Sequence, residues 1–344
     1  MMIMKKTPFA GQTLDLRETE RAIKLIKDFF ELRLSETLSL QRVSAPILVR
    51  SGTGVNDDLN GIERKVSFAI PNDGHSRAEI VLSLAKWKRQ ALSDYGFSHG
   101  EGLCTGMNAI RPDETLDELH SIYVDQWDWE RIISPEERSL EFLKFIVRKI
   151  YGVIRETEQM IHEKYPGIAP ILPGEITFVH SEELQKRYPR LTPRQREDEI
   201  TKERGAVFVT GIGSELADGR PHDGRAPDYD DWTTPTEGGR GLNGDIIVWH
   251  PPLAKAMELS SMGIRVDPES LLEQLKIRKA EKRMEMDWHR RLISGELPLS
   301  IGGGIGQSRL CMFFLRKLHI GEVQAGVWPE SIVQDCAKKG IRLL

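Results

Sequence analysis

The 344-residue sequence is poor in cysteine and has no large excess of charge of either sign. Its three cysteines, Cys104, Cys311 and Cys336, lie far apart and form no CxxC pair, which excludes a disulfide framework and a cysteine-built zinc site. The formal net charge of -4 at pH 7 argues against the basic surface with which proteins usually displace counterions from nucleic acid. We therefore expect no nucleic-acid partner.

Long apolar runs are also missing. The amino-terminal segment MMIMKKTPFAGQ places a few apolar residues before two lysines, the reverse of a secretory signal, and is too short to span a bilayer. Hydrophobic residues make up 39% and charged residues 29% of the chain, which is ordinary for a soluble globular protein. We expect a cytoplasmic protein without a membrane partner, in which residues 1–16 are an extension and residues 17–344 form one domain.

The pattern of apolar residues predicts both helices and strands. Apolar residues recur at helical spacing between residues 17 and 34, which predicts an amphipathic helix. The run VSAPILV at 43–49 predicts a strand, and Pro46 favours an edge or interface position because proline cannot donate to a ladder.

Local signals mark two further helices. Ser134, Pro135 and Glu137 supply a cap, a proline at the first helical position and a capping-box acid. Asp267 followed by Pro268 predicts another helix start. Further strands are predicted at 103–110, 120–130, 176–180, 206–210 and 245–249, and polar loops at 189–202 and 216–240. The mixture indicates an α+β fold.

The segment IGGGIGQSRL, starting at residue 301, carries the most informative local pattern. Gly302, Gly304 and Gly306 alternate before Arg309, so that a flat ligand could lie against bare backbone while the arginine meets a phosphate. The segment is neither a Walker loop nor a good dinucleotide fingerprint. Taken alone, it is explained equally well as a glycine-rich turn that leads into a buried helix.

A second arginine, Arg111, lies in the segment IRPDE between two predicted strands. Alone it is best explained as part of a solvated charge cluster in a hairpin loop. Together with Arg309 it could hold the opposite end of a triphosphate, which would leave the α-phosphorus open to in-line attack by a carboxylate.

Three segments resemble the signature motifs of class II aminoacyl-tRNA synthetases. Pro46 resembles the proline of the first motif, at the dimer interface; Arg111 resembles the second-motif arginine on the α-phosphate; and Arg309 resembles the third-motif arginine on the γ-phosphate. The stretches SLAKWKRQ, VDQWDWE and ELSSMGIRV are similar to substrate and metal segments of aspartyl-tRNA synthetases. The resemblance implies an antiparallel sheet flanked by helices, and a homodimer.

The chain as a whole most resembles the ammonia-dependent asparagine synthetases, the bacterial type of aspartate–ammonia ligase. The segments that carry this resemblance are SLAKWKRQ, YVDQWDWER, RAPDYDDW, GLNGDI, ELSSMGIRVD, IGGGIGQSR and AGVWP. The residues before about Arg17 and the run Asn56-Asp57-Asp58 depart from the pattern. The resemblance implies ATP-dependent synthesis of L-asparagine from L-aspartate and ammonia through a β-aspartyl-adenylate, with release of AMP and pyrophosphate.

The resemblance assigns an aspartate pocket. Gln126 and Asp128, two apart on a predicted strand, face the same side and can hold the substrate ammonium group. Lys88 and Arg265 can hold the carboxylate that does not react, with arginine supplying two parallel hydrogen bonds. Ser83 belongs to the same substrate segment.

The remaining assignments concern the nucleotide, the metal and the proton. Asp245 and Glu258 are candidate ligands of Mg²⁺, because hard carboxylate oxygens suit a magnesium ion that also binds phosphates. Arg225 and Ser260 are candidate nucleotide contacts. Ammonium must lose a proton before it attacks, and the candidate acceptors are Asp57 first and Asp230 second, although an ordinary turn also explains Asp57. The full set of catalytic candidates is Asp57, Arg111, Asp230 and Arg309.

Other functions remain open at this point. Gly102-Leu103-Cys104-Thr105-Gly106 fits a nucleophile elbow, as a glutamine-dependent amidotransferase would need, but Cys104 leads along a strand rather than into a helix. An aspartyl- or asparaginyl-tRNA synthetase has little room for an anticodon-binding barrel before residue 43. An inactive regulatory relative is disfavoured because Lys88, Arg111 and Arg309 are all present.

Overall fold

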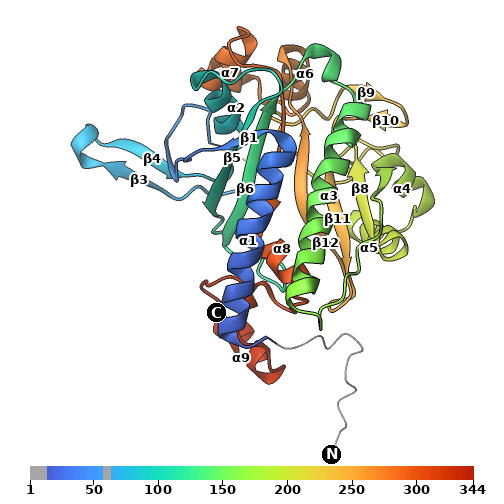
Figure 1. The fold of residues 1–344 in the computed structure, drawn as a ribbon. Coiled ribbons are helices and arrows are strands. Elements are labelled where there is room, and N and C mark those ends of the chain that lie inside the picture. Colours follow the sequence, from blue (N-terminus) through green and yellow to red (C-terminus); the bar gives the residue numbers. More distant parts are fainter. Residues whose placement is uncertain (1–13, 57–62) are drawn as a thin grey trace, which may run out of the picture.

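The computed structural model describes residues 14–56 and 63–344 (Figure 1). Its helices are α1 (Leu16–Leu38), α2 (Ala85–Asp94), α3 (Leu140–Lys164), α4 (Ser181–Arg187), α5 (Pro193–Arg204), α6 (Pro268–Ile277), α7 (Asp287–Ile293), α8 (Gln307–Phe314) and α9 (Glu330–Lys338). Its strands are β1 (Leu40–Arg42), β2 (Leu48–Arg50), β3 (Ser67–Ile70), β4 (Ser76–Ile80), β5 (Gly102–Ile110), β6 (Tyr123–Ile132), β7 (Thr177–His180), β8 (Ala206–Thr210), β9 (Pro235–Thr236), β10 (Gly239–Arg240), β11 (Asn243–His250), β12 (Lys255–Ile264) and β13 (Ser300–Gly306). Within this described part, the helices contain no apolar stretch of bilayer-spanning length.

An eight-stranded sheet organises the fold, with strand order β1-β5-β6-β13-β12-β11-β8-β7. The inner strands pair antiparallel, which confirms the α+β prediction. The edge strands β1 and β7 are parallel to their neighbours, so the sheet is mixed rather than purely antiparallel. Both edge strands reach their partners through long connections that contain helices, the kind of crossover that parallel pairing requires.

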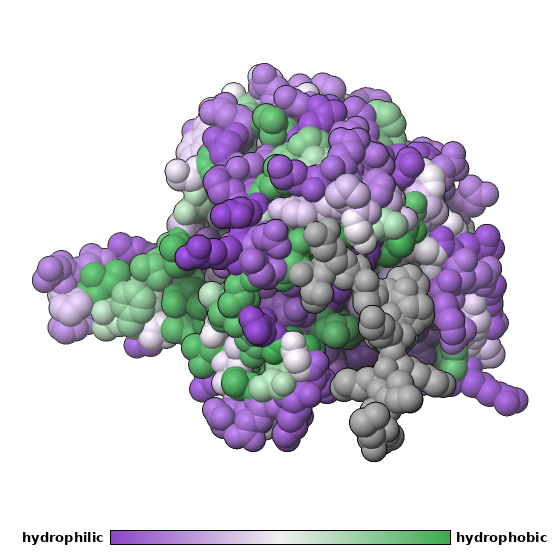
Figure 2. Space-filling model, turned by 60° about the horizontal axis from the view of Figure 1, so that its bottom comes forward, coloured by the Kyte–Doolittle hydropathy of each residue, from purple (hydrophilic) through white to green (hydrophobic). Residues whose placement is uncertain are grey.

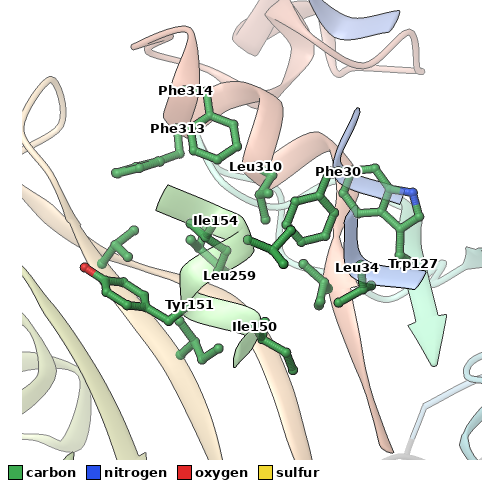
Figure 3. Close-up of a cluster of buried hydrophobic side chains, with 14 of the residues drawn as sticks. Phe30, Leu34, Trp127, Ile150, Tyr151, Ile154, Leu259, Leu310, Phe313 and Phe314 are labelled. Atoms are coloured by element: carbon green, nitrogen blue, oxygen red, sulfur yellow. The ribbon is translucent and has the colours of Figure 1, made fainter. Parts of the chain in front are cut away.

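The main hydrophobic core lies between one face of this sheet and helices α1, α3 and α8 (Figures 1 and 3). Figure 3 shows Phe30 of α1 beside Trp127 of β6, with ring centroids 4.7 Å apart, and Ile154 of α3 near Leu259 of β12. The predicted helix at 17–34 is confirmed and extends to Leu38; a capping box formed by Asp15 starts it. The helix starts at this point because the Asp15 side chain accepts a hydrogen bond from the backbone N–H of Glu18 in the first turn.

Strand β6 separates the core from the opposite face of the sheet. Trp127 and Trp129 belong to the core, so Gln126, Asp128 and Glu130 project to the other side, because side chains alternate along a strand. On that second face, α2 packs on β5, β6 and β13, and α5 packs on β8, β11 and β12. A cavity lies over the centre of the sheet between these helices.

A small sheet, β2-β4-β3, forms an arm whose β3–β4 hairpin projects from the body (Figure 1). Ile47, Leu48 and Phe68 at this arm are 56%, 44% and 44% exposed. Figure 2 shows apolar surface along the projecting arm. The arm presents apolar side chains to its surroundings.

Two predictions at element boundaries were wrong in part. Of the predicted strand at 43–49, residues 43–47 form the connection between β1 and β2, and only Leu48 and Val49 belong to a strand, the edge strand β2. Pro46 lies in the irregular part, because proline has no N–H for a ladder. The Ser134 signal starts only a 3₁₀ turn, Pro135–Glu137, and the long helix begins at Leu140 with Ser139 as its cap.

The segment 189–202, predicted as a polar loop, is mostly helix α5. Only Arg196, Ile200 and Thr201 of this helix are buried, so its apolar stripe is too narrow to be recognised from hydrophobic periodicity. Thr192 and Gln195 form a capping box with Pro193 at the first helical position, and this signal could have located the helix.

Candidate active site

The centre of the sheet is the floor of a cavity of about 620 Å³. Its walls come from the start of α2, the β5–β6 loop, the segment before β11, and strands β6, β12 and β13. Segments that are far apart in the chain thus converge here. The predicted site residues that line the cavity are Ser83, Lys88, Arg111, Gln126, Asp128, Arg225, Asp230, Glu258, Arg265, Gly304, Gly306 and Arg309.

The alternating glycines of β13 lie opposite the polar side chains of β6. In the ladder, Gly302 pairs with Glu130, Gly304 with Asp128 and Gly306 with Gln126. A Cβ atom at Gly304 would lie 2.9 Å from Asp128 Oδ1 and even closer to Gln126 Oε1. The glycines therefore make room for these side chains to lie across β13.

The prediction that a nucleotide lies against the backbone of Gly302 was wrong. The space above it is filled by the Glu130 carboxylate and the Arg265 guanidinium, and Gly302 is buried. The physical reason is that Glu130 points to the same face as Asp128 and reaches over β13.

A buried ion pair stands at one end of the cavity. Lys88, which is 1% exposed, places Nζ 2.9 Å from Asp128 Oδ2 and donates to the carbonyl oxygen of Gly303 at 2.8 Å. Asp128 Oδ1 is buried without a hydrogen-bond partner among the described residues. Because Gln126 Oε1 also approaches Gly304, the two acceptors form a pocket suited to a cationic group.

Arg265 lies beside this pair and is held by two acids. It donates to both oxygens of Glu130, at 2.8 to 3.2 Å, and to Asp230 Oδ1. Glu130 was missed from the sequence. Its position two residues after Asp128 on the same strand face was the available signal.

The cavity also holds arginines from two distant segments. Arg111 Nη2 contacts the carbonyl oxygen of Leu82 at 3.5 Å, and its Nε is buried without a partner among the described residues. Arg309 on α8 donates to the carbonyl oxygen of Glu258 at 3.1 Å, and its Nη1 lies 3.8 Å from Glu258 Oε1. The arrangement is compatible with anionic groups bound between these arginines.

Asp245 and Glu258 lie on neighbouring strands. Asp245 pairs with Ser261 and Ile247 pairs with Glu258, with an irregularity between them. This bulge lets Glu258 face the same side as Ser261, although the two residues are three positions apart and would face opposite sides of a regular strand. Asp245 and Glu258 therefore share a face of the sheet.

The Asp245 carboxylate is engaged by Arg225, whose Nη2 lies 2.5 and 2.6 Å from its two oxygens. Burial raises the pKa of Asp245, the Glu258 carboxylate adds to this rise, and Arg225 opposes it. Among the described residues, no three acidic, histidine or cysteine side chains are grouped as a complete metal site. The donor set fits a magnesium ion that takes its other ligands from phosphates and water.

One predicted residue faces away from the cavity, and another is not among the residues that the structure describes. Ser260 pairs with Ile305 and Ile246, which both belong to the core, so its hydroxyl faces away from the cavity; Ser261 lines the cavity instead. Asp57 lies outside the described residues.

Cys104 is 0% exposed in the middle of β5. Burial raises the pKa of its thiol to about 12, and the strand continues to Ile110 without the strand-to-helix turn of a nucleophile elbow. The structure therefore argues against a glutaminase site at Cys104.

The sequence pattern of one family matches nearly the whole chain: the aspartate–ammonia ligases, over residues 17–340. The chain belongs to the aspartate–ammonia ligase family. Aspartate–ammonia ligases of Clostridium perfringens and Parabacteroides distasonis are 60% and 58% identical to it, with 96% of each chain covered. The aspartate–ammonia ligase of Bacteroides fragilis is 56% identical to it, again with 96% of each chain covered.

Solved structures with a similar fold are aminoacyl-tRNA synthetases. Asparaginyl-tRNA synthetase from Pyrococcus horikoshii, complexed with asparaginyl-adenylate, has a TM-score of 0.67 at 16% identity and covers 90% of this chain and 70% of its own. Aspartyl-tRNA synthetase from Entamoeba histolytica has a TM-score of 0.61 at 14% identity, with 91% and 59% covered. The similarity confirms the predicted class II synthetase fold.

Proposed function

We propose that this member of the aspartate–ammonia ligase family makes L-asparagine from L-aspartate and ammonia with ATP. The β-carboxylate attacks the α-phosphorus and pyrophosphate leaves, which yields β-aspartyl-adenylate. Ammonia then attacks the acyl carbon, and AMP leaves. The observation that best supports an aspartate substrate is the partnerless acceptor Asp128 Oδ1 beside the cations Lys88 and Arg265.

The charges of the cavity orient the substrate. Asp128 and Gln126 would accept hydrogen bonds from the substrate ammonium group, while Arg265 and Lys88 would hold the α-carboxylate, with Ser83 at the same wall. A substrate held at these two groups directs its β-carboxylate toward the rest of the cavity. This orientation selects the β-carboxylate for activation.

Arg111 and Arg309 would hold the α- and γ-phosphates, with Arg225 near them and Gly306 beneath the nucleotide. Gly304 would instead belong to the aspartate pocket, since Gln126 and Asp128 lie over it. Asp245 and Glu258 would hold Mg²⁺, which offsets phosphate charge when it is bound. Arg225 would have to leave Asp245 for the metal to bind there, since it contacts both carboxylate oxygens.

A carboxylate would take the proton that ammonium loses. Asp57 remains our first candidate. Asp230 lines the cavity, but its Oδ1 already accepts a hydrogen bond from Arg265, which makes it the second.

We also propose a homodimer in the cytoplasm, without a nucleic-acid or membrane partner. The support for a dimer is the apolar arm next to Pro46, where Ile47, Leu48 and Phe68 are exposed, since exposed apolar clusters often mark interfaces.

The experiment is incubation of the purified protein with ATP, Mg²⁺, L-aspartate and ammonium. We expect asparagine, AMP and pyrophosphate in equal amounts, and exchange of labelled pyrophosphate into ATP that needs aspartate but not ammonium. ADP with phosphate as products would contradict the adenylate route. Aminoacylation of tRNA would instead indicate a tRNA synthetase.

A further inference from the structure

Glu130 lies behind the cavity wall and is 0% exposed. It is two residues beyond Asp128 on the same face of β6. A buried carboxylate is costly unless opposite charges and hydrogen bonds offset its desolvation. The contacts of Glu130 therefore indicate its role.

Arg265 supplies most of these contacts. Its Nε donates to Glu130 Oε1 at 2.9 Å and to Oε2 at 3.2 Å, and its Nη2 donates to Oε2 at 2.8 Å. Ser300 Oγ donates to Oε1 at 2.8 Å. Burial alone raises the pKa of Glu130, but Arg265, with help from Lys88 and Ser300, outweighs burial and holds that pKa below its ordinary value. Glu130 thus stays ionised.

These contacts leave Arg265 with a defined set of donors. A guanidinium has five N–H bonds; Glu130 takes one on Nε and one on Nη2, and Asp230 takes one on Nη1. Counted over the hydrogen bonds of the described residues, Arg265 keeps one unused N–H on Nη1 and one on Nη2. The Arg265 side chain lines the cavity. Two parallel N–H bonds are what a carboxylate accepts from arginine.

Gly302 provides an independent observation. It pairs opposite Glu130, and a Cβ atom there would lie 2.7 Å from Arg265 Nη2 and inside contact distance of the Glu130 carboxylate. The absence of a side chain at Gly302 thus leaves space for both the Glu130 carboxylate and the Arg265 guanidinium.

We propose that Glu130 is a positioning residue for aspartate recognition. By holding one edge of Arg265, it fixes the guanidinium plane so that the free N–H bonds on Nη1 and Nη2 meet the α-carboxylate of the substrate. This inference rests on the proposed function. It assigns part of the selectivity for a dicarboxylic substrate to a residue that does not touch the substrate.

The test compares Glu130→Gln and Glu130→Asp with the wild-type enzyme. Glutamine keeps the size but loses the charge and one acceptor oxygen; aspartate keeps the charge but is one methylene shorter. For Glu130→Gln we expect the KM for aspartate to rise by roughly 10- to 100-fold, as expected for a misplaced binding group, with the KM for ATP nearly unchanged. Glu130→Asp should show a smaller rise.

The matched control is Glu141→Gln, an exposed acid in an ion pair with Lys144 on α3, which should keep both KM values. A purely structural role would lower the active fraction, and so kcat, without separating the two KM values. An unchanged KM for aspartate, or an equal rise for ATP, would overturn the proposal.

If Glu130→Gln does not fold, Ser300→Ala and Glu130→Asp decide the matter. Ser300→Ala removes one hydrogen bond from Glu130 Oε1 and should raise the KM for aspartate by about 2- to 12-fold, the range of one hydrogen bond. If the KM for aspartate is unchanged in both variants, the proposal is wrong. A wild-type enzyme that forms no asparagine would instead refute the proposed function itself.

Discussion

Gly304 lies directly opposite Asp128 in the ladder between β13 and β6. This single relationship links the glycine pattern to the aspartate pocket, since any side chain at Gly304 would enter the space of Asp128 and Gln126. The alternation of glycines is thus explained by its neighbours on β6 as much as by a ligand.

We predict that Gly304→Ala raises the KM for aspartate or abolishes asparagine formation, while the protein still folds. The added methyl group would lie 2.9 Å from Asp128 Oδ1 and displace that carboxylate, which we expect to reduce kcat/KM by about 100-fold, as for other misplaced binding groups. Steady-state kinetics measure this. The control is Gly152→Ala in α3, where a Cβ atom meets nothing within 4 Å; full activity of Gly304→Ala would refute the prediction.

Replacing Glu258 by glutamine should lower the affinity of the enzyme for Mg²⁺. One of two carboxylates is removed, so we expect the Mg²⁺ concentration for half-maximal pyrophosphate exchange to rise by about tenfold. Binding of Mn²⁺ in the presence of ATP, followed by electron paramagnetic resonance, gives a readout independent of turnover. Glu199→Gln, an exposed acid on α5, should leave both measurements unchanged. An unaltered metal requirement in Glu258→Gln would remove Glu258 from the metal site.

Cys104→Ala should retain ammonium-dependent activity. The thiol is buried and its pKa is raised by burial to about 12, so it is not a nucleophile near neutral pH. We expect the variant to be destabilised by about 1 kcal/mol through a small cavity, with an unchanged KM for ammonium. Glutamine should fail as nitrogen donor in both proteins. Glutamine use that disappears in the variant would restore the amidotransferase hypothesis.

His250 should make the protein sensitive to acid. Burial lowers the pKa of this histidine to about 4, and its Nε2 lies 2.8 Å from the carbonyl oxygen of Lys317. The unfolded chain, with an ordinary histidine pKa of about 6.5, binds the proton first as pH falls. The stabilisation is therefore fully present above pH ~6.5 and lost progressively down to pH ~4, with about 2 kcal/mol lost at pH 5.

Urea unfolding at pH 7.5 and 5.0 measures this effect. The difference in the free energy of unfolding between pH 7.5 and 5.0 should be about 2 kcal/mol smaller in His250→Asn than in the wild type. This holds even if the variant is less stable at both pH values. His75→Asn is the control, because His75 is exposed and its left-handed backbone, φ 61°, tolerates asparagine. An equal pH dependence in His250→Asn and wild type would show that another group is responsible.

Sequence patterns were reliable where a structure depends on near neighbours in the chain. The helix from Leu16 follows from helical periodicity, the strand at Ala206–Thr210 follows from a short apolar run, and helix α6 follows from Asp267 and Pro268 at its start. Motif resemblance located the cavity as well, because Lys88, Arg111 and Arg309 carry their identity in short segments and all line it. Helix α5 was missed because its buried stripe is narrow.

Tertiary structure alone decided which side chains meet. The bulge between β11 and β12 brings Glu258 to the face of Ser261 and turns Ser260 toward the core, and no local pattern specifies a bulge. The pairing of Gly302 with Glu130 depends on the register of two strands about 170 residues apart in the chain. The sequence by itself determined the family, the residue types of the site and most elements. The partners of Arg265 and the purpose of the glycines followed only from the packed sheet, because register and burial are properties of the whole fold.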